Sequence, residues 1–213
     1  MSGVARLYGL RLRTPRLELR LGSREELLEL GRVAAAGIHP PDEMPFAVAW
    51  TDRSGEPDFV ESFVAFHEEA LAHWAPEAWT LNLLVWAEGD LAGSQTLGAE
   101  QFAETRRVSS GSWLGRDAQR RGLGTEMRAA VLELAFGGLG AEAAESAWLE
   151  GNDASRRVSE KLGYREVSRS TQSPRGEPVV SHDVALERER WRCPVPVEIE
   201  GLEPCLPLFG LSA

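Results

Sequence analysis

The sequence predicts an α/β fold, and three stretches carry this prediction. Residues 111–127 combine a short strand, an arginine-rich loop, two glycines one residue apart, and a helix. Residues 145–162 repeat the order of a strand followed by a helix. Residues 79–97 are typical of two strands joined by a tight turn. Strands and helices that alternate along one chain favour a sheet with helices packed on it.

The N-terminal region predicts a strand, a helix and a loop. Residues 16–21 alternate leucines with charged residues, which is typical of a strand with one buried face. Ser23 and Glu26 have the spacing of a capping box, which predicts a helix from there to about Ala36. Residues 37–46 are proline-rich and are expected to form an irregular loop, long enough to serve a function.

Polar side chains in this loop and in the helix after it are candidate ligands. His39, Asp42 and Glu43 are placed to face a substrate, although a solvated loop is the simpler interpretation. We keep His39 and Glu43 as candidate substrate-binding residues. His67 and His73 are expected to be packing or surface residues, and no cluster has metal-site spacing, so no metal is predicted.

The middle of the chain predicts one helix and a hairpin. Residues 57–74 begin with a proline and carry phenylalanines at helical spacing. Residues 79–87 and 91–97 form the two strands of the hairpin, with Gly93 and Gly98 as candidate bulges. The elements that follow are predicted strands over 106–114, 145–150, 164–170 and 179–186, a helix over 123–136, and a helix from Asn152 or Asp153 to Gly163.

The C-terminal residues 191–213 differ from the rest of the chain. Four prolines exclude a regular helix, and the apolar residues here are more than a free terminus should expose. We therefore expect one domain over residues 1–190 and a tail over 191–213 that packs on the domain or on a dimer partner. The apolar residues of the tail include Val195, Val197, Ile199, Leu202, Leu206, Leu208 and Phe209.

Composition narrows the class of protein. The chain has 213 residues and a net charge of −10, which argues against a nucleic-acid partner because binding to phosphates needs a basic face. No apolar run is long enough for a membrane span or a signal peptide, so no membrane partner is expected. Two cysteines are too few for a disulfide scaffold. A cytoplasmic protein is the simplest interpretation.

The glycines at 122 and 124 predict an anion site. The first N–H groups of a helix have no partner inside the helix, and the helix dipole adds positive charge there. A phosphate is the natural occupant, with Arg120 and Arg121 as additional charge. A P-loop would need a lysine before Thr125, and a dinucleotide fingerprint would need a glycine at Met127. A loop before an ordinary helix is the remaining alternative.

A resemblance to a known family decides among these alternatives. Gln119-Arg-Arg-Gly122-Leu-Gly124 is similar to the Q/R-x-x-G-x-G/A signature of the GNAT superfamily of acyl-CoA-dependent N-acyltransferases. Twenty-eight residues beyond Gly124, the segment from Asn152 to Tyr164 resembles the family's next strand–helix unit. Trp113-Leu-Gly and Thr14-Pro-Arg-Leu-Glu-Leu-Arg resemble the RimJ/RimL-like branch. The resemblance covers roughly residues 10–190.

The resemblance implies a fold, a co-substrate and a set of site residues. The fold would be a mixed central sheet of six to seven strands, splayed in the middle, with helices on both faces. Acetyl-CoA or another acyl-CoA would lie between the splayed strands, and an amine acceptor would attack its thioester directly, in a ternary complex. A homodimer is a further expectation. The implied coenzyme A-binding residues are Trp113, Leu114, Gln119, Arg120, Arg121, Gly122, Leu123, Gly124, Thr125 and Asn152.

The chain departs from the family at the proton donor. Many members carry a tyrosine seven residues after the asparagine, where this chain has Ser159. Ser155 matches a serine of RimL-like members and is the preferred donor to the thiolate, with Asn152 beside it as the second catalytic candidate. A serine that only contacts backbone in the first helical turn is an equally good interpretation. Glu150 and Glu100 are candidate bases, and ordered water is the alternative; Glu150 is also a candidate substrate contact.

Two functions remain after the sequence has been considered, with a dehydrogenase as a third and weakest option. The leading one is an N-acyltransferase that moves an acetyl or other short acyl group, such as succinyl, to a primary amine of a small molecule or a protein N-terminus. The alternative is a catalytically silent acyl-CoA-binding regulatory module on the same fold. The residues identify neither the acceptor nor the acyl group.

Overall fold

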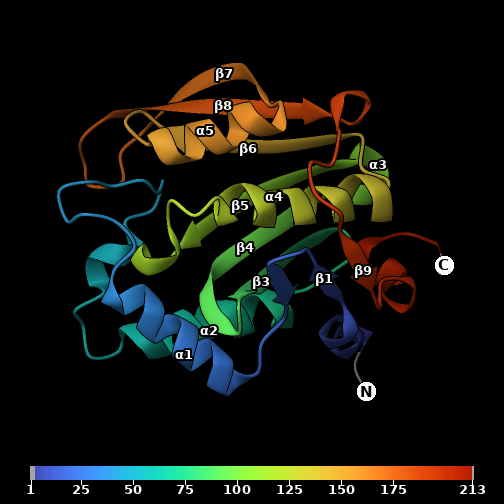
Figure 1. The fold of residues 1–213 in the computed structure, drawn as a ribbon, viewed down its shortest axis with the longest axis horizontal. Coiled ribbons are helices and arrows are strands. Elements are labelled where there is room, and N and C mark those ends of the chain that lie inside the picture. The colour runs from blue at the N-terminus through green and yellow to red at the C-terminus, as the bar shows by residue number, and fades with distance from the viewer. Residues whose placement is uncertain (1–2, 213) are drawn as a thin grey trace.

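Nine strands form one sheet in the computed structural model, which describes residues 3–212 (Figure 1). Their order is β7-β8-β6-β5-β4-β3-β2-β1-β9, and every neighbouring pair is antiparallel except β5 and β6, which are parallel. The α/β class and the mixed sheet are therefore confirmed. The strands are β1 Arg11–Arg13, β2 Leu17–Arg20, β3 Ala78–Ala87, β4 Asp90–Glu100, β5 Arg107–Leu114, β6 Ala143–Leu149, β7 Arg165–Gln172, β8 Val179–Glu187 and β9 Glu198–Glu200.

Helices cover both faces of the sheet. Alternate residues of β3 point to opposite sides, so Leu83 packs with the residues of α4 whereas Leu84 packs with those of α1 and α2. None of the helices in the described range is long and apolar enough to cross a membrane. The helices are α1 Arg24–Ala36, α2 Phe59–Ala72, α3 Phe102–Thr105, α4 Leu123–Glu133 and α5 Asp153–Leu162.

Local signals in the sequence explain where α1 and α5 begin and end. The Ser23 hydroxyl accepts the Glu26 N–H while the Glu26 carboxylate accepts the Ser23 N–H, so the predicted capping box is present. Asn152 caps α5 through its side chain, and Gly163 ends that helix with a φ of 89°. These ends depend on contacts between residues close in the sequence, which is why the sequence predicts them well.

The structure differs from the predicted elements in three places. A register shift lies at Val85, which pairs with Gly93, as expected for a bulge there. Gly98 continues the ladder without a shift, so the bulge predicted at Gly98 is wrong. A Cβ at Gly98 would make a tight contact, 3.2 Å from the Trp79 carbonyl oxygen, so a glycine suits this position. Beyond α4 the chain adds a π-helical turn over Leu134–Gly138. Strands β1 and β9, three residues each, explain why nine strands form where six to seven were expected.

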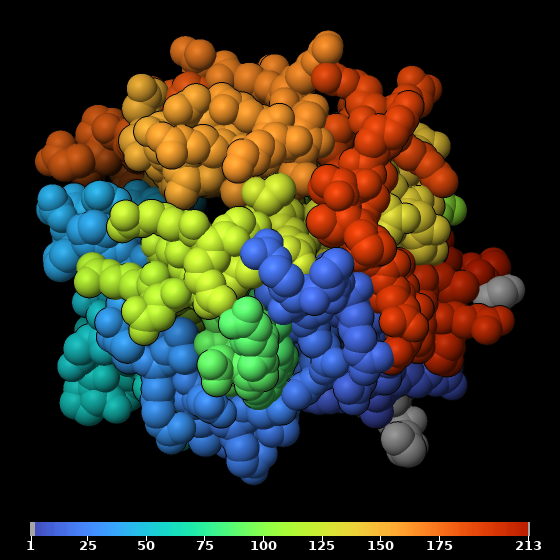
Figure 2. Space-filling model, viewed as in Figure 1, coloured from blue at the N-terminus to red at the C-terminus, as the bar shows by residue number. Residues whose placement is uncertain are grey.

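The tail is built into the same sheet. β9 pairs with β1, and a 3₁₀ helix over Glu203–Phe209 brings Cys205 and Phe209 to 0% exposure. Figure 2 shows the red C-terminal segment lying against the blue N-terminal segment and the yellow-green α4 region. The prolines do exclude an α-helix here, as predicted, but not a 3₁₀ helix. The division of the chain at residue 190 stays a prediction.

Burial of His67 on α2 predicts a loss of stability in acid. His67 is 6% exposed and packs against Phe63 with tilted rings, and burial lowers its pKa from 6.5 to about 4. Between these two pKa values the unfolded chain takes up a proton that the folded chain refuses, so acid favours unfolding. When the pH falls from about 7 to about 4.5, protonation of His67 in the unfolded chain should lower the free energy of unfolding of the unsubstituted protein (the parent) by about 2–3 kcal/mol.

Urea unfolding at both pH values measures this effect. His67→Leu should remove that part of the pH dependence. His73→Leu is the control, because His73 is exposed at the end of α2 and hydrogen-bonds only the Glu69 carbonyl within the described residues. Equal pH dependence in His67→Leu and the parent would contradict the prediction.

Candidate active site

A gap opens where the two parallel strands part. β5 and β6 pair only from Arg107 opposite Ala143 to Ser109 opposite Glu145. Beyond that point a hydroxyl bridge, from Ser146 Oγ to the Ser110 carbonyl at 2.9 Å, makes the last link. The cavity beyond it measures about 350 Å³ and is lined by β5, β6, α4, α5 and the loop over residues 38–47.

The N-terminus of α4 stands at this cavity with a row of unpaired donors. Gly122 adopts a φ of 80°, and no side chain caps the helix. Within residues 3–212, the backbone N–H groups of residues 121–125 donate to no protein acceptor. Gly124 lines the cavity without a side chain to cover the amides. Such a row, at the positive end of the helix dipole, suits a phosphate or pyrophosphate.

The N-terminal segment supports this helix end. Glu126 is 5% exposed and accepts hydrogen bonds from the Thr14 hydroxyl at 2.6 Å and from Arg16 Nε at 2.7 Å. Arg16 Nη1 also donates to the Arg121 carbonyl at 2.9 Å. Arg16 therefore lies beside the row of amides, and sequence reasoning missed it. The available signal is Thr14-Pro-Arg16, a segment that resembles the RimJ/RimL-like branch and also contains this arginine.

Three polar side chains tie the loop over residues 37–46 to the site. Gln119 Nε2 donates to the Ile38 carbonyl at 2.6 Å, and Arg116 donates to the His39 carbonyl at 2.7 Å. Asn152 Nδ2 donates to the Pro45 carbonyl at 3.3 Å. The amide nitrogens of Gln119 and Asn152, predicted to contact coenzyme A, thus hold the loop in this structure.

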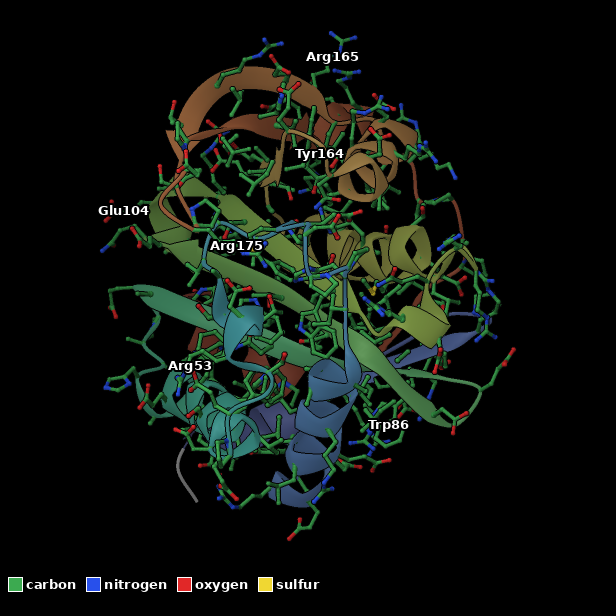
Figure 3. All side chains as sticks on the ribbon, turned by 90° about the vertical axis from the view of Figure 1, so that its left-hand side faces the viewer. Arg53, Trp86, Glu104, Tyr164, Arg165 and Arg175 are labelled. Atoms are coloured by element: carbon green, nitrogen blue, oxygen red, sulfur yellow. The ribbon has the colours of Figure 1, made fainter. Side chains whose placement is uncertain are left out.

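A further ion pair closes the same side of the molecule. Arg175, in the turn between β7 and β8, donates to both carboxylate oxygens of Asp52 at 2.6 and 2.9 Å. Figure 3 looks onto this side and shows Arg175 beside the loop that follows α1. Asp52 and Arg175 line a neighbouring hollow of about 440 Å³, which shares Ile38 and His39 with the cavity.

The predicted site residues divide into two groups. The cavity is lined by eight of them, and the others lie elsewhere. Leu123 is buried in the core, and Arg120, Arg121 and Gly122 are exposed at the helix end. Thr125 is half-buried there. The eight lining residues are His39, Glu43, Trp113, Leu114, Gln119, Gly124, Asn152 and Ser155.

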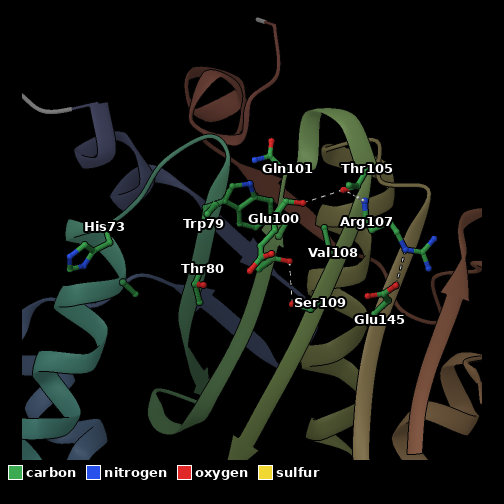
Figure 4. Close-up of a pocket in the computed structure, with 14 residues that line it drawn as sticks. His73, Trp79, Thr80, Glu100, Gln101, Thr105, Arg107, Val108, Ser109 and Glu145 are labelled. Carbon is green, nitrogen blue, oxygen red and sulfur yellow. Dashed lines mark hydrogen bonds and ion pairs between the residues drawn. The ribbon is translucent and has the colours of Figure 1, made fainter. Parts of the chain in front are cut away.

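The two candidate bases are not at the cavity. Glu150 accepts a hydrogen bond from His182 Nε2 at 3.0 Å, and Glu166 contacts Nδ1 of the same ring at 2.7 Å. The pKa of His182 is raised, mainly by its hydrogen bond to Glu166 and to a smaller extent by the one to Glu150. Desolvation of the ring acts in the opposite direction but is outweighed. Glu100 lines a separate hollow of about 700 Å³ at the other end of β3, β4 and β5 (Figure 4). Glu100 is the one predicted candidate among the residues that line this hollow.

The two serines of α5 have different surroundings. Ser155 lines the cavity, its N–H donates to Asn152 Oδ1 at 3.0 Å, and its hydroxyl makes no hydrogen bond within the described range. Ser159 is 2% exposed and lies outside the cavity lining, and its hydroxyl is also without a partner in residues 3–212. Of the two serines, only Ser155 lines the cavity.

A cavity residue that sequence reasoning missed is Arg128. It is 3% exposed and donates to Ser146 Oγ at 3.0 Å and to Ser112 Oγ at 3.1 Å, across the point where β5 and β6 part. A signal was available, because Arg128 interrupts an apolar run in a helix whose next four residues are completely buried. A helix that is apolar on all sides is usually buried, and a charged residue is rarely buried there without a partner or a function.

Together these features describe an α/β sheet in which a helix end with unpaired N–H groups lies beside a gap between two parted parallel strands. The family described as the acetyltransferase (GNAT) domain matches residues 16–165. The chain belongs to this family of acetyltransferases.

Solved structures share the fold at low sequence identity. RimJ of Mycobacterium smegmatis in complex with CoA-disulfide is 18% identical with a TM-score of 0.68, and 95% of each chain is covered. RimL, a ribosomal L7/L12 alpha-N-protein acetyltransferase in complex with coenzyme A, is 16% identical with a TM-score of 0.63, covering 82% of this chain and 95% of that one. A GNAT-family acetyltransferase from Bacillus anthracis is 16% identical with a TM-score of 0.63, covering 84% and 99%.

Proposed function

We propose that this chain is an N-acyltransferase of the RimJ/RimL-like branch. It moves an acetyl or other short acyl group from acyl-CoA to a primary amine of a small molecule or a protein N-terminus. The observation that carries the proposal is the row of unpaired N–H groups at residues 121–125 beside the cavity between β5 and β6. Pyrophosphate would bind the amides, and the pantetheine arm would follow the cavity. The RimJ and RimL structures are complexes with CoA-disulfide and coenzyme A, which supports this choice of ligand.

The reaction we propose is direct attack in a ternary complex. The uncharged amine nitrogen forms a bond to the thioester carbonyl carbon, the carbon–sulfur bond breaks, the amine releases one proton and the thiolate takes up one. Cys193 and Cys205 lie in the tail and neither lines the cavity, which disfavours a cysteine acyl-enzyme. His39 and Glu43 line the outer part of the cavity, and we propose that they contact the acceptor. A cytoplasmic location and a homodimer stay predictions.

Thiol release tests the proposal. An acyl-CoA that binds in calorimetry and releases free coenzyme A only when an amine is added supports an acyltransferase. Binding without release across an amine library would favour the catalytically silent regulatory module. Absence of any coenzyme A binding would overturn both functions.

Ser155→Ala is expected to lower kcat by at least about tenfold with little change in acyl-CoA affinity. The hydroxyl at the cavity wall would hydrogen-bond the departing thiolate or relay a proton from water, and general acid help is worth about 10²–10⁴-fold. Ser159→Ala is the matched control and should leave kcat unchanged, because it removes a buried hydroxyl that has no partner within the described residues. Equal kcat for Ser155→Ala and the parent would contradict the role of Ser155 in thiolate departure, and no other residue is proposed as the acid.

A further inference from the structure

Arg128 is a buried cation whose charge nothing in the described structure balances. The guanidinium is held by two neutral hydroxyls, those of Ser112 and Ser146. Its Nε has no hydrogen-bond partner, and Arg128 forms no ion pair with a carboxylate of residues 3–212. An arginine presents five N–H donors and stays charged in proteins. Buried charges are normally paired, because an unpaired one costs several kcal/mol.

The position of Arg128 makes this cation part of the cavity. Arg128 and Gly124 both line it, and they are four residues apart on α4, which places Arg128 about one helical turn beyond the row of amides. The hydroxyls that hold Arg128 belong to β5 and β6, next to the last link between these strands. One helix thus brings positive charge to the cavity twice, at its N-terminus and about one turn further along.

Acetyl-CoA matches only the first of these positions. Its pyrophosphate suits the amides, but the pantetheine arm and the acetyl group are neutral, so they would leave Arg128 buried without a counter-charge. A second carboxylate at the far end of the acyl group would supply that charge. Guanidinium and carboxylate groups fit each other in a planar, two-bond arrangement.

We infer that the cavity takes an acyl-CoA whose acyl group ends in a carboxylate, as in succinyl-CoA, and that Arg128 binds this carboxylate. This inference rests on the proposed acyltransferase function and names its donor substrate. A carboxylate on the acceptor is the competing source of negative charge. The acyl group is favoured because Arg128 lies at the strand end of the cavity, whereas His39 and Glu43 lie in the loop that forms the outer wall.

Equilibrium binding tests the inference without an acceptor. Calorimetry would compare coenzyme A, acetyl-CoA, butyryl-CoA and succinyl-CoA; butyryl-CoA has the same acyl chain length as succinyl-CoA but no charge. The parent should bind succinyl-CoA at least about tenfold more tightly than butyryl-CoA, which is the effect of one charge-assisted contact. Arg128→Met should abolish this preference and leave butyryl-CoA affinity unchanged. Replacing a buried charge by an apolar side chain of similar volume is usually tolerated.

Arg120→Gln is the control, because Arg120 is exposed at the helix end and its loss should weaken all four ligands by a similar factor. Equal affinity of the parent for succinyl-CoA and butyryl-CoA would overturn the inference, and this comparison needs no variant. An Arg128→Met effect on all four ligands, or on the acceptor KM alone, would also overturn it. Failure of every ligand to bind would instead overturn the proposed function.

Discussion

Phe209→Ala is expected to lower the free energy of unfolding by about 3–5 kcal/mol, the cost of removing a fully buried aromatic side chain. Phe209 has 0% exposure, and its ring centroid lies 4.8 Å from that of Trp79 and 5.5 Å from that of Trp74. The Trp74 indole N–H also donates to the Leu208 carbonyl at 2.8 Å. A hole at Phe209 would therefore loosen the joint between the tail and β3.

Urea unfolding of Phe209→Ala and Phe66→Ala separates burial from a general effect of losing a phenyl ring. Phe66 is 61% exposed, so its replacement should change the unfolding free energy by no more than about 0.5 kcal/mol. Phe209→Leu should fall between the two, because leucine fills part of the cavity. Similar losses for Phe209→Ala and Phe66→Ala would mean that the tail does not contribute to the core.

Gly124→Val is expected to weaken acetyl-CoA binding by at least about a hundredfold, the loss of two charge-assisted hydrogen bonds to the pyrophosphate. Gly124 has ordinary helical backbone, and a Cβ would lie 3.6 Å from a Val158 methyl and 3.8 Å from a Leu114 methyl. The folded protein can therefore accept a side chain there. The two further methyl groups of valine would stand between the amides and the ligand.

Gly124 is a cleaner test than Gly122, whose φ of 80° would strain any other residue. Calorimetry with acetyl-CoA measures the effect, and a thermal melt shows that the variant is folded. Gly55→Val is the control, since a Cβ at Gly55 meets nothing within 4 Å. Unchanged affinity in folded Gly124→Val would contradict the proposed phosphate site.

Features that depend on contacts close in the sequence were predicted well. The capping box at Ser23, the Asn152 cap and the Gly163 stop each involve residues within one or two helical turns, and the structure contains all three. The paired strands at residues 79–97 follow for the same reason, since their turn is short. Three-residue strands such as β1 and β9 carry no detectable pattern, and their pairing joins residues almost two hundred positions apart.

The sequence predicted where the site lies better than it predicted which partners its side chains contact. The signature from Gln119 to Gly124 located the helix end, but it did not show that the amide of Gln119 would hold the loop at Ile38. Glu150 follows its strand as expected, yet its partner is His182 on β8, which only the pairing of β6 with β8 could reveal.

The sequence by itself determined that the chain forms an α/β sheet with a helix whose N-terminus presents bare amides, because periodicity, caps and glycines act over a few residues. Only the tertiary structure decided that β5 and β6 part after three paired residues, that the 37–46 loop lies over the gap, and that Arg128 faces the cavity without a carboxylate in the described range. Such features depend on which distant segments meet. The balance of a buried charge is a property of all its neighbours, and the sequence does not say which residues these are.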